Sequence, residues 1–354
     1  MKHFNYLISC IGLIFSLTAC REAPGDNNEG SCDYASLFSL SDFGNGKSLL
    51  TVFSPYDSSC DSLMTDGSMD RIVCMSSTAV AAFSALGAGD CVIGVSGIDY
   101  ISDPYIRDHS DLICDVGYDA DLNYEGIVSI QPDIVLAYST SSVKPSYVSK
   151  LESLGIPVLV LYDYLEEHPL ARTEYLKLYG TLVGKREEAD SLFNVIADNY
   201  ERLAARVSAS EPVPVLMNLP YAGIWYIPGK DNYMSKLLSD AGAYVPGAKA
   251  GSASSTISIE RAYELSGQAK LWLNPGWCTS KEEIAAVHPL IAEFPILSNG
   301  RIFNNIKRCT PMGGNDFWES GSLRPDLILN DLVQMIHPEL SDPGDSLFYH
   351  IELK

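Results

Sequence analysis

The segment from residue 185 to residue 209 constrains the fold of this chain more than any other. Its apolar residues recur at three- and four-residue steps, the pattern of a helix with one buried face. Neither Gly nor Pro interrupts it before Pro212, so we expect a helix of about 37 Å, the length of a whole domain. A helix of this length is expected to connect two separately folded parts of the chain. Its apolar positions are Ala189, Leu192, Phe193, Ile196, Tyr200, Leu203 and Val207.

On both sides of this segment, short apolar runs alternate with helical stretches. Strands buried on both faces have this composition, and helices between them indicate βαβ units with a parallel sheet. We therefore predict an α/β protein with two Rossmann-like lobes and mainly parallel sheets. One long α-helix joins the lobes, and a ligand cleft lies between them. The apolar runs are residues 71–75, 91–95, 134–137, 158–161 and 213–217.

The two halves contain a matching segment. Residues 125–136 and 260–271 each begin with a Glu, are interrupted by Pro or Gly seven residues later, and end in an apolar strand. A carboxylate near the N-terminal end of a helix is favoured by the helix dipole, which alone could explain either Glu as a cap. Because they occur at matching places, Glu125 and Glu260 are predicted to have a paired role.

The first twenty residues have the pattern of an export signal. Lys2 precedes an apolar run over residues 6–17, which is too short for a settled membrane-spanning helix. The run ends at residues 17–20 in Leu-Thr-Ala-Cys, which resembles the bacterial lipobox. We therefore expect residues 1–19 to be removed as a lipoprotein signal peptide and Cys20 to be acylated. An ordinary secretory peptide with an incidental cysteine is the alternative.

Composition excludes some classes of function. The 354 residues include 45 Asp and Glu against 24 Lys and Arg, a formal net charge of −21. A nucleic-acid-binding protein needs a surplus of Lys and Arg to neutralise phosphates, and docking on anionic lipid needs a basic face. Hydrophobic residues make up 46% of the chain, enough for sizeable cores. We expect an acidic globular protein that binds no nucleic acid and meets a membrane only through its lipid anchor.

Seven cysteines follow Cys20, and an oxidising envelope compartment permits disulfides between them. None has the C-x-x-C spacing of a zinc or thioredoxin-like site, and an odd number leaves at least one thiol unpaired. The plausible disulfides are Cys278 with Cys309 and Cys32 with Cys60.

The sequence lacks the motifs of common enzymes. It contains no complete G-x-G-x-x-G, P-loop, nucleophile elbow or H-E-x-x-H. The pairs Asp163/Glu166 and Asp316/Glu319 could act as acid and base, but isolated carboxylates are usually solvated. We predict that the protein is not an enzyme and holds no cofactor or metal of its own.

Aromatic residues gather where loops should leave strands. In open α/β sheets, ligands bind beyond the carboxyl ends of strands, and flat aromatic side chains suit a large planar or rigid ligand. A loop Trp can equally cover a core, so both interpretations stay open for each residue. The predicted ligand-binding residues of this kind are Tyr100, Tyr118, Trp225, Tyr226, Trp277, Phe317 and Trp318, together with Asp316 beside the last two.

Four stretches of the chain contain motifs that occur in the same order in one known family. They are residues 71–77, 85–95, 123–137 and 154–158. They resemble the substrate-binding proteins of iron-siderophore, haem and cobalamin ABC importers, and the resemblance covers about residues 68–335. It implies two α/β lobes joined by one long helix, with the ligand between them. In that family a Glu on each lobe pairs with Arg residues of the permease, and Glu125 and Glu260 match those positions.

The resemblance implies a lipid-anchored substrate-binding protein of an ABC importer. Such a protein would capture a ferric siderophore, haem or cobalamin and deliver this iron or cobalt chelate to a permease dimer with its ATPase subunits. We expect a monomer in the bacterial cell envelope that faces the periplasm rather than the cell surface. The alternatives are a surface lipoprotein that hands its ligand to an outer-membrane transporter, and an envelope enzyme that acts on a metal chelate.

The sequence does not select one ligand. The family binds anionic ferric siderophores, haem or neutral corrinoids, and an anionic ligand would need local positive charge in this acidic chain. Lys307 and Arg308 are the cationic candidates for the ligand site, although a solvated surface pair is an equal alternative. The aromatic residues favour a macrocycle such as a corrinoid or haem.

The expected organisation follows from these patterns. It comprises a signal peptide (1–19), a flexible tether (20–34), a small β appendage outside the resemblance (35–66), an N-terminal α/β lobe (67–184), the connecting helix (185–209), a C-terminal α/β lobe (210–340) and a C-terminal tail (341–354).

Overall fold

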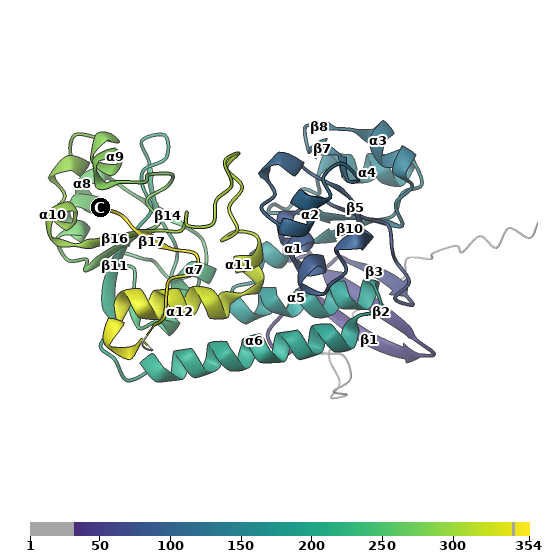
Figure 1. The fold of residues 1–354 in the computed structure, drawn as a ribbon, viewed down its shortest axis with the longest axis horizontal. Coiled ribbons are helices and arrows are strands. Elements are labelled where there is room, and N and C mark those ends of the chain that lie inside the picture. Colours follow the sequence, from purple (N-terminus) through teal and green to yellow (C-terminus); the bar gives the residue numbers. More distant parts are fainter. Residues whose placement is uncertain (1–31, 342–343) are drawn as a thin grey trace, which may run out of the picture.

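The computed structural model describes residues 32–341 and 344–354 and has two lobes above a layer of helices (Figure 1). The predicted signal peptide, Cys20 and most of the predicted tether lie outside the described residues. The predicted fold class is confirmed, because each lobe has a mainly parallel sheet and a long helix connects the two. Within the described ranges, no helix combines the length and apolar content needed to cross a membrane.

A five-stranded parallel sheet forms the N-terminal lobe. The apolar runs of the sequence form strands that are largely buried. The strand order is β10 (Val158–Leu161), β9 (Ile134–Tyr138), β4 (Ile72–Cys74), β5 (Val92–Val95) and β6 (Cys114–Asp115). The other elements are α1 (Ser77–Ala85), α2 (Pro104–Asp108), α3 (Tyr124–Ile130), α4 (Ser146–Ser153) and the hairpin of β7 (Gly117–Tyr118) and β8 (Asp121–Leu122).

The C-terminal lobe has a second five-stranded sheet, parallel except for its last strand. The order is β13 (Ala243–Tyr244), β11 (Val213–Met217), β15 (Leu271–Leu273), β16 (Arg301–Asn304) and β17 (Ile351–Glu352). Helices α7 (Tyr233–Asp240), α8 (Ile259–Ser266), α9 (Lys281–Ala286) and α10 (Pro295–Asn299) accompany it, with a strand pair β12 (Trp225–Ile227) and β14 (Ser255–Ile257).

The last residues of the chain are an integral part of this lobe rather than a tail. Strand β17 pairs with β16, and Tyr349 and His350 are buried. The carboxylate of Asp331 accepts hydrogen bonds from the backbone N–H groups of Phe348, Tyr349 and His350. Asp331 belongs to helix α12 (Pro325–Ile336), so these three hydrogen bonds attach residues 348–350 to that helix.

One long helix connects the lobes, and two further helices pack against it. Helix α6 (Arg186–Val207) lies within the expected range, 185–209, and runs along the lower edge of Figure 1. Both α5 (Pro169–Leu182) and α12 (Pro325–Ile336) pack against it. The buried face of α6 includes Ala189, Phe193, Ile196 and Tyr200, as the sequence pattern predicts.

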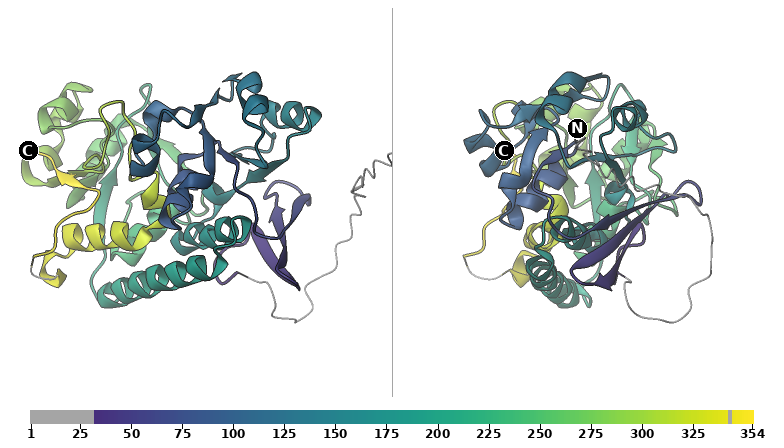
Figure 2. Two further views of the ribbon diagram at one scale, coloured as in Figure 1. Left: turned by 45° about the vertical axis from the view of Figure 1, so that its right-hand side comes forward. Right: turned by 90° about the vertical axis from the view of Figure 1, so that its right-hand side faces the viewer.

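The β appendage is a three-stranded antiparallel sheet of β1 (Phe38–Gly44), β2 (Lys47–Phe53) and β3 (Cys60–Thr65). Both views of Figure 2 show it beside the N-terminal lobe and one end of the helical layer.

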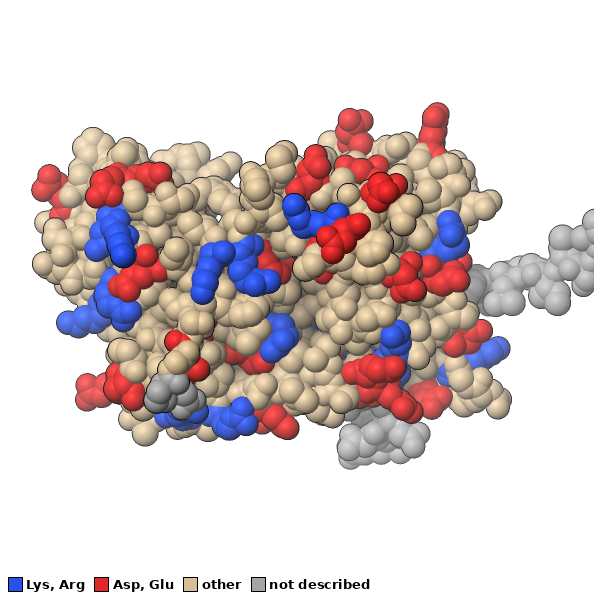
Figure 3. Space-filling model, viewed as in Figure 1, with Lys and Arg blue, Asp and Glu red and all other residues tan. Residues whose placement is uncertain are grey.

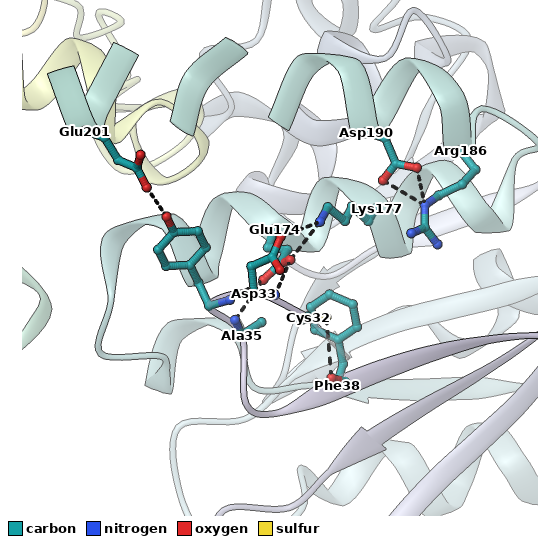
Figure 4. A network of polar contacts seen from close by, with 10 residues as sticks. Cys32, Asp33, Ala35, Phe38, Glu174, Lys177, Arg186, Asp190 and Glu201 are labelled. Carbon is teal, nitrogen blue, oxygen red and sulfur yellow. Dashed lines mark hydrogen bonds and ion pairs between the residues drawn. The ribbon is translucent and has the colours of Figure 1, made fainter. Parts of the chain in front are cut away.

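The segment before the appendage is tied down by two carboxylates. The backbone N–H groups of residues 33–35 donate to Glu174 at 2.8–2.9 Å (Figure 4). Those of residues 36 and 37 donate to Glu166. Burial raises the pKa of Glu174, but Lys177 and the three N–H groups outweigh it and hold this pKa below its usual value. The expected tether of residues 20–34 is therefore attached to α5 from residue 33 onward.

Candidate functional site

A cavity of about 580 Å³ lies between the lobes. Its walls are the carboxyl ends of the C-terminal strands, the segment 305–318, and the start of the connection that follows β10. A second cavity of about 400 Å³ lies on the N-terminal side, where Ser76 and Tyr138 mark the ends of β4 and β9. Both cavities are lined by Tyr164, Arg172 and Trp318. This is the position at which parallel α/β sheets bind ligands, and the volume suits a small molecule.

Trp277 lines the larger cavity, and 67% of its side chain is exposed. The loop that carries it is fixed by buried Asn304, whose Nδ2 donates to the carbonyl oxygens of Gly276 at 2.9 Å and Cys278 at 2.8 Å. Gly276 has a φ of +58°, a left-handed conformation that favours glycine. The backbone on either side of the ring is thus held in place although the ring is open to solvent.

Trp318 lines both cavities and is half exposed. Its ring meets Phe317 edge-on, with 4.7 Å between centroids, and Phe317 in turn packs edge-on against Tyr349 and His350. Phe317 is 1% exposed, so the structure places it in the core and not at the ligand site predicted for it. It supports the neighbouring Trp318 from behind.

Arg172 contributes the one cationic side chain found in the described lining of the two cavities. Its Nε donates to the carbonyl oxygen of Glu166 at 3.3 Å and its Nη2 to that of Tyr164 at 2.6 Å. The guanidinium also lies 3.8 Å from the ring centroid of Tyr233, which is a cation–π contact. Arg172 is therefore a fixed part of the cavity wall with several donors already used.

Trp225 is placed in the core of the C-terminal lobe, contrary to its predicted ligand contact. It is 1% exposed, its ring centroid lies 5.8 Å from those of Trp272 and Phe294, and its Nε1 donates to the carbonyl oxygen of Met217 at 3.0 Å. An indole is readily buried when its N–H finds a partner. Tyr226, next along the strand, is 40% exposed but does not line either cavity.

Tyr100 and Tyr118 lie together on the N-terminal lobe, outside the lining of both cavities. Each is 52% exposed, and their rings meet edge-on with centroids 6.5 Å apart. A Cβ on Gly97 would lie 2.5 Å from the Tyr118 hydroxyl oxygen. The absence of a side chain at Gly97 therefore leaves the room that the Tyr118 ring occupies. The two tyrosines form a surface pair instead of a wall of the site.

The predicted cationic pair also lies outside the cavity lining. Lys307 Nζ donates to the carbonyl oxygen of Leu347. Arg308 forms an ion pair with Asp316 and lies 4.5 Å from the ring centroid of Phe348. These charges fasten the C-terminal segment to the loop 307–316, and Asp316 likewise pairs with protein instead of facing a ligand.

The seven described cysteines are free thiols, so neither predicted disulfide is present. The Cys32 thiol donates to the carbonyl oxygen of Phe38 at 3.7 Å, and burial raises its pKa to about 12. Cys60 begins the outer strand β3, where it is exposed. Burial also raises the pKa of both Cys278 and Cys309. In the part of the chain that the structure describes, no three His, Cys, Asp or Glu side chains could hold a metal ion.

Glu125 and Glu260 occupy the same position in the two lobes. Each is the second residue of a short helix, α3 or α8, whose preceding cap residue accepts a hydrogen bond from the N–H group three residues later. Both are exposed, and the helix N-terminus with Ser258 lowers the pKa of Glu260. Helices α3 and α8 lie toward opposite ends of the upper half of Figure 1, and acidic side chains project from this upper edge in Figure 3.

Sequence comparison identifies the class of protein that this two-lobed architecture defines. The chain matches the periplasmic binding protein family over residues 72–305 and belongs to that family. Its members bind solutes and are not enzymes, which agrees with the prediction of a binding protein.

Three curated relatives come from an archaeon and a bacterium. Two uncharacterised lipoproteins of Methanocaldococcus jannaschii are each 27% identical, over 77% and 66% of this chain. The chain spans 66% and 59% of their own lengths, less than two thirds in each case. An uncharacterised ABC transporter substrate-binding lipoprotein of Bacillus subtilis is 28% identical over 44% of this chain and 48% of the relative.

Solved structures share the fold at low sequence identity. A periplasmic haem-binding protein from Pseudomonas aeruginosa has a TM-score of 0.59 at 20% identity, covering 80% of this chain and 98% of that one. A periplasmic binding protein from Veillonella parvula has a TM-score of 0.62 at 14% identity, covering 81% of this chain and 98% of the other.

The site contains residues that the sequence patterns did not single out. Asn218, Asn274 and Asn305 line the larger cavity, as do Tyr164 and Arg172. Each of the three asparagines directly follows a strand, β11, β15 or β16. A polar residue directly after a predicted strand was the available signal. It is less distinctive in a sequence than a tryptophan in a loop.

Proposed function

We propose that this protein is the lipid-anchored substrate-binding component of an ABC importer and that it binds an iron- or cobalt-containing chelate. The observation that carries the proposal is the inter-lobe cavity, walled by strand ends and by the exposed rings of Trp277 and Trp318. Aromatic faces of this kind suit a large, rigid ligand. Membership of the periplasmic binding protein family supports the same function.

The proposed anchor is the acylated thiol of Cys20, in the bacterial cell envelope and facing the periplasm. The lipobox-like residues 17–20 support it, and relatives from two organisms are named lipoproteins. The described chain is fastened to α5 from residue 33, so residues 21–32 would separate the anchor from the folded body.

Purification from native cells tests the proposal directly. The full chain is isolated, and its visible spectrum and metal content are measured. We expect one chelate for each chain, recovered unaltered after denaturation. Conversion of the chelate on repeated addition would instead show an enzyme, and recovery of a metal-free solute would exclude a chelate-binding protein.

The proposed partner is a permease dimer with its ATPase subunits, to which Glu125 and Glu260 would bind from the two lobes of a monomer. Exposed ion pairs are individually weak, so these residues would set orientation and encounter rather than hold the complex together.

Charge reversal of both residues, E125K with E260K, tests this docking role. We expect ligand affinity to stay unchanged and uptake by whole cells to fall by at least about tenfold, because like charges then face the permease. The matched control is E187K with E188K, which reverses two exposed first-turn glutamates of α6 on the opposite side of the molecule. Loss of ligand affinity in the first variant, or equal loss of uptake in the control, would contradict the assignment.

A further inference from the structure

A segment of the C-terminal half of the chain reaches the N-terminal lobe beside the two cavities. It comprises residues 309–319, between β16 and α11 (Ser320–Leu323), and we call it the strap. In Figure 1 the loop that leads into α11 rises between the two lobes. Trp318, near the end of the strap, lines both cavities, so the strap forms part of the ligand site.

The first part of the strap is a hairpin held by its own contacts. Cys309 and Asn315 form a β-bridge, and the N–H of Thr310 donates to the carbonyl oxygen of Gly314 at 2.7 Å. Just before the hairpin, Arg308 forms an ion pair with Asp316. The hairpin therefore keeps its shape without help from the N-terminal lobe.

Two polar contacts attach the end of the strap to the N-terminal lobe. The carboxylate of Glu319 accepts from the backbone N–H of Ser102 at 2.9–3.0 Å and from its hydroxyl at 2.7 Å. Oγ1 of Thr78 donates to the carbonyl oxygen of Trp318 at 3.4 Å. Both contacts lie outside the two five-stranded sheets, so they can break while the sheets stay intact.

The hairpin also lies against the backbone of the N-terminal lobe. A Cβ at Gly314 would lie 2.2 Å from the carbonyl oxygen of Tyr100 and 2.8 Å from its carbonyl carbon. Gly314 has no left-handed φ, so its lack of a side chain serves this close approach and not a turn. The strap is thus seated on residues 100–102 by shape as well as by hydrogen bonds.

We propose that the strap is a latch, which leaves residues 100–102 when a ligand enters or leaves the inter-lobe cavity and returns over the bound molecule. Trp318 moves with the strap, so its release opens one aromatic wall of both cavities. Closing segments of this kind exclude solvent and commonly set the rates of entry and release. This inference rests on the proposed function because it takes the inter-lobe cavity as the ligand site.

The buried carboxyl group of Glu319 makes the latch sensitive to pH. Burial raises the pKa of Glu319 to about 7 against the hydrogen bonds from Ser102, and Asp316 and Asp103 add to the effect. A charged Glu319 is repelled by these two carboxylates, so release becomes more favourable as the pH rises. Helix α1, which packs against α11, has no titratable residue. The titratable groups on the other elements around Glu319 include Asp103, the Arg308–Asp316 pair, the Arg324–Asp326 pair, and Arg172 and Tyr179 of α5.

Hydrogen exchange of the full chain without ligand tests the latch. G314A places a methyl group against the carbonyl oxygen of Tyr100, so the strap should lift and the amide of Ser102 should exchange at least about tenfold faster. M312A, at a 55% exposed position of the same hairpin, is the control. Unchanged exchange at Ser102 in G314A would overturn the proposal. Faster exchange that includes β9 and β15 would show general unfolding, and the pH measurement then decides.

The pH measurement compares the wild type with E319Q. A Glu319 pKa near 7 in the attached state and 4.5 in the released state predicts that release of the wild-type strap rises about tenfold from pH 6 to pH 8. Exchange at Ser102, corrected for the intrinsic effect of pH, should rise by that factor in the wild type and in E211Q, which changes an exposed carboxylate. It should stay constant in E319Q. Equal pH dependence in all three would overturn the proposal.

Ligand kinetics connect the latch to the site. Haem, dicyanocobinamide and a ferric catecholate siderophore are each mixed with the full chain, and tryptophan fluorescence is followed by stopped flow. For a probe that binds, G314A should raise the association and dissociation rates together by about tenfold, because a latch obstructs both directions. A rise in the dissociation rate alone would indicate a lost wall contact and overturn the latch. Failure of all three probes to bind would contradict the proposed function, and exchange at Ser102 would still decide whether the strap releases.

Discussion

At the scale of single residues, Asn304 has the largest effect on the shape of the site. It is fully buried at the end of β16, and its amide joins that strand to the loop carrying Trp277. Its Oδ1 accepts from the N–H of Asn305, so the same side chain also orients a second residue of the cavity lining. One buried amide thus fixes both an aromatic and a polar part of the cavity wall.

N304D is expected to lower the free energy of unfolding by about 2–4 kcal/mol, because a carboxylate cannot donate to the two carbonyl oxygens and leaves them buried without partners. Hydrogen exchange should show lost protection at residues 276–279. The control is N299D, the same change at an exposed position. Equal stability of the two variants by urea unfolding would show that the Asn304 amide does not hold the loop.

The structure places some of the predicted aromatic residues at the cavity and others in the core. Trp277 and Trp318 line the cavity, whereas Trp225 is buried. All three follow glycine-containing stretches, so local sequence does not separate them. Trp225 begins β12, and the face it presents is set by pairing with β14, some thirty residues further along the chain. That long-range register has no local signature.

At the scale of elements, the close approach of α5 and α6 determines how the lobes are connected. Gly180 lies where the two helices meet: a Cβ there would be 2.6 Å from the carbonyl oxygen of Lys185 and 2.7 Å from Cβ of Ala189. The lack of a side chain allows this packing. The amphipathic pattern of residues 185–209 predicts the helix but does not reveal that α5 and α12 reinforce it, because its apolar stripe is compatible with several partners.

G180A should lower the free energy of unfolding by about 1–3 kcal/mol, since the added methyl group must push α5 and α6 apart. Urea unfolding measures the effect. G267A is the control, because Gly267 has a helical φ of −72° and its nearest neighbour would be 3.5 Å from the new Cβ. It should leave stability unchanged or raise it by up to about 1 kcal/mol. Similar values for the two variants would refute tight helix packing at Gly180.

At the scale of the whole molecule, a loop of the C-terminal half joins the two lobes. The carboxylate of Glu319, just before α11 (Ser320–Leu323), accepts from the backbone N–H of Ser102 at 2.9–3.0 Å and from its hydroxyl at 2.7 Å. Burial raises the pKa of Glu319 to about 7, and the nearby Asp316 and Asp103 add to the effect against the hydrogen bonds from Ser102. The lobes therefore meet at a buried group that titrates near neutral pH.

The sign of the resulting pH dependence follows from linkage. The folded protein holds the Glu319 proton more tightly than the unfolded chain, whose glutamate has a pKa near 4.5. The stabilisation from this proton is complete below pH 4.5 and is lost as the pH rises to about 7. E319Q, which stays uncharged, should flatten the fall in unfolding free energy between these values. The control E211Q changes an exposed carboxylate. Parallel profiles for wild type and E319Q, measured by urea unfolding at several pH values, would exclude Glu319 as the source.

The sequence by itself determined the fold class, the central strands and the long helix. Hydrophobic periodicity, and the Gly and Pro residues that end helices and strands, are local properties of the sequence. It also placed Glu125 and Glu260 at matching helix starts through a repeated pattern. The tertiary structure alone decided which aromatic rings reach the cavity and which groups Lys307 and Arg308 contact. It also decided which strand ends line the cavity together. Those outcomes depend on contacts between residues far apart in the chain, and such contacts form only when the two sheets and the helical layer pack together.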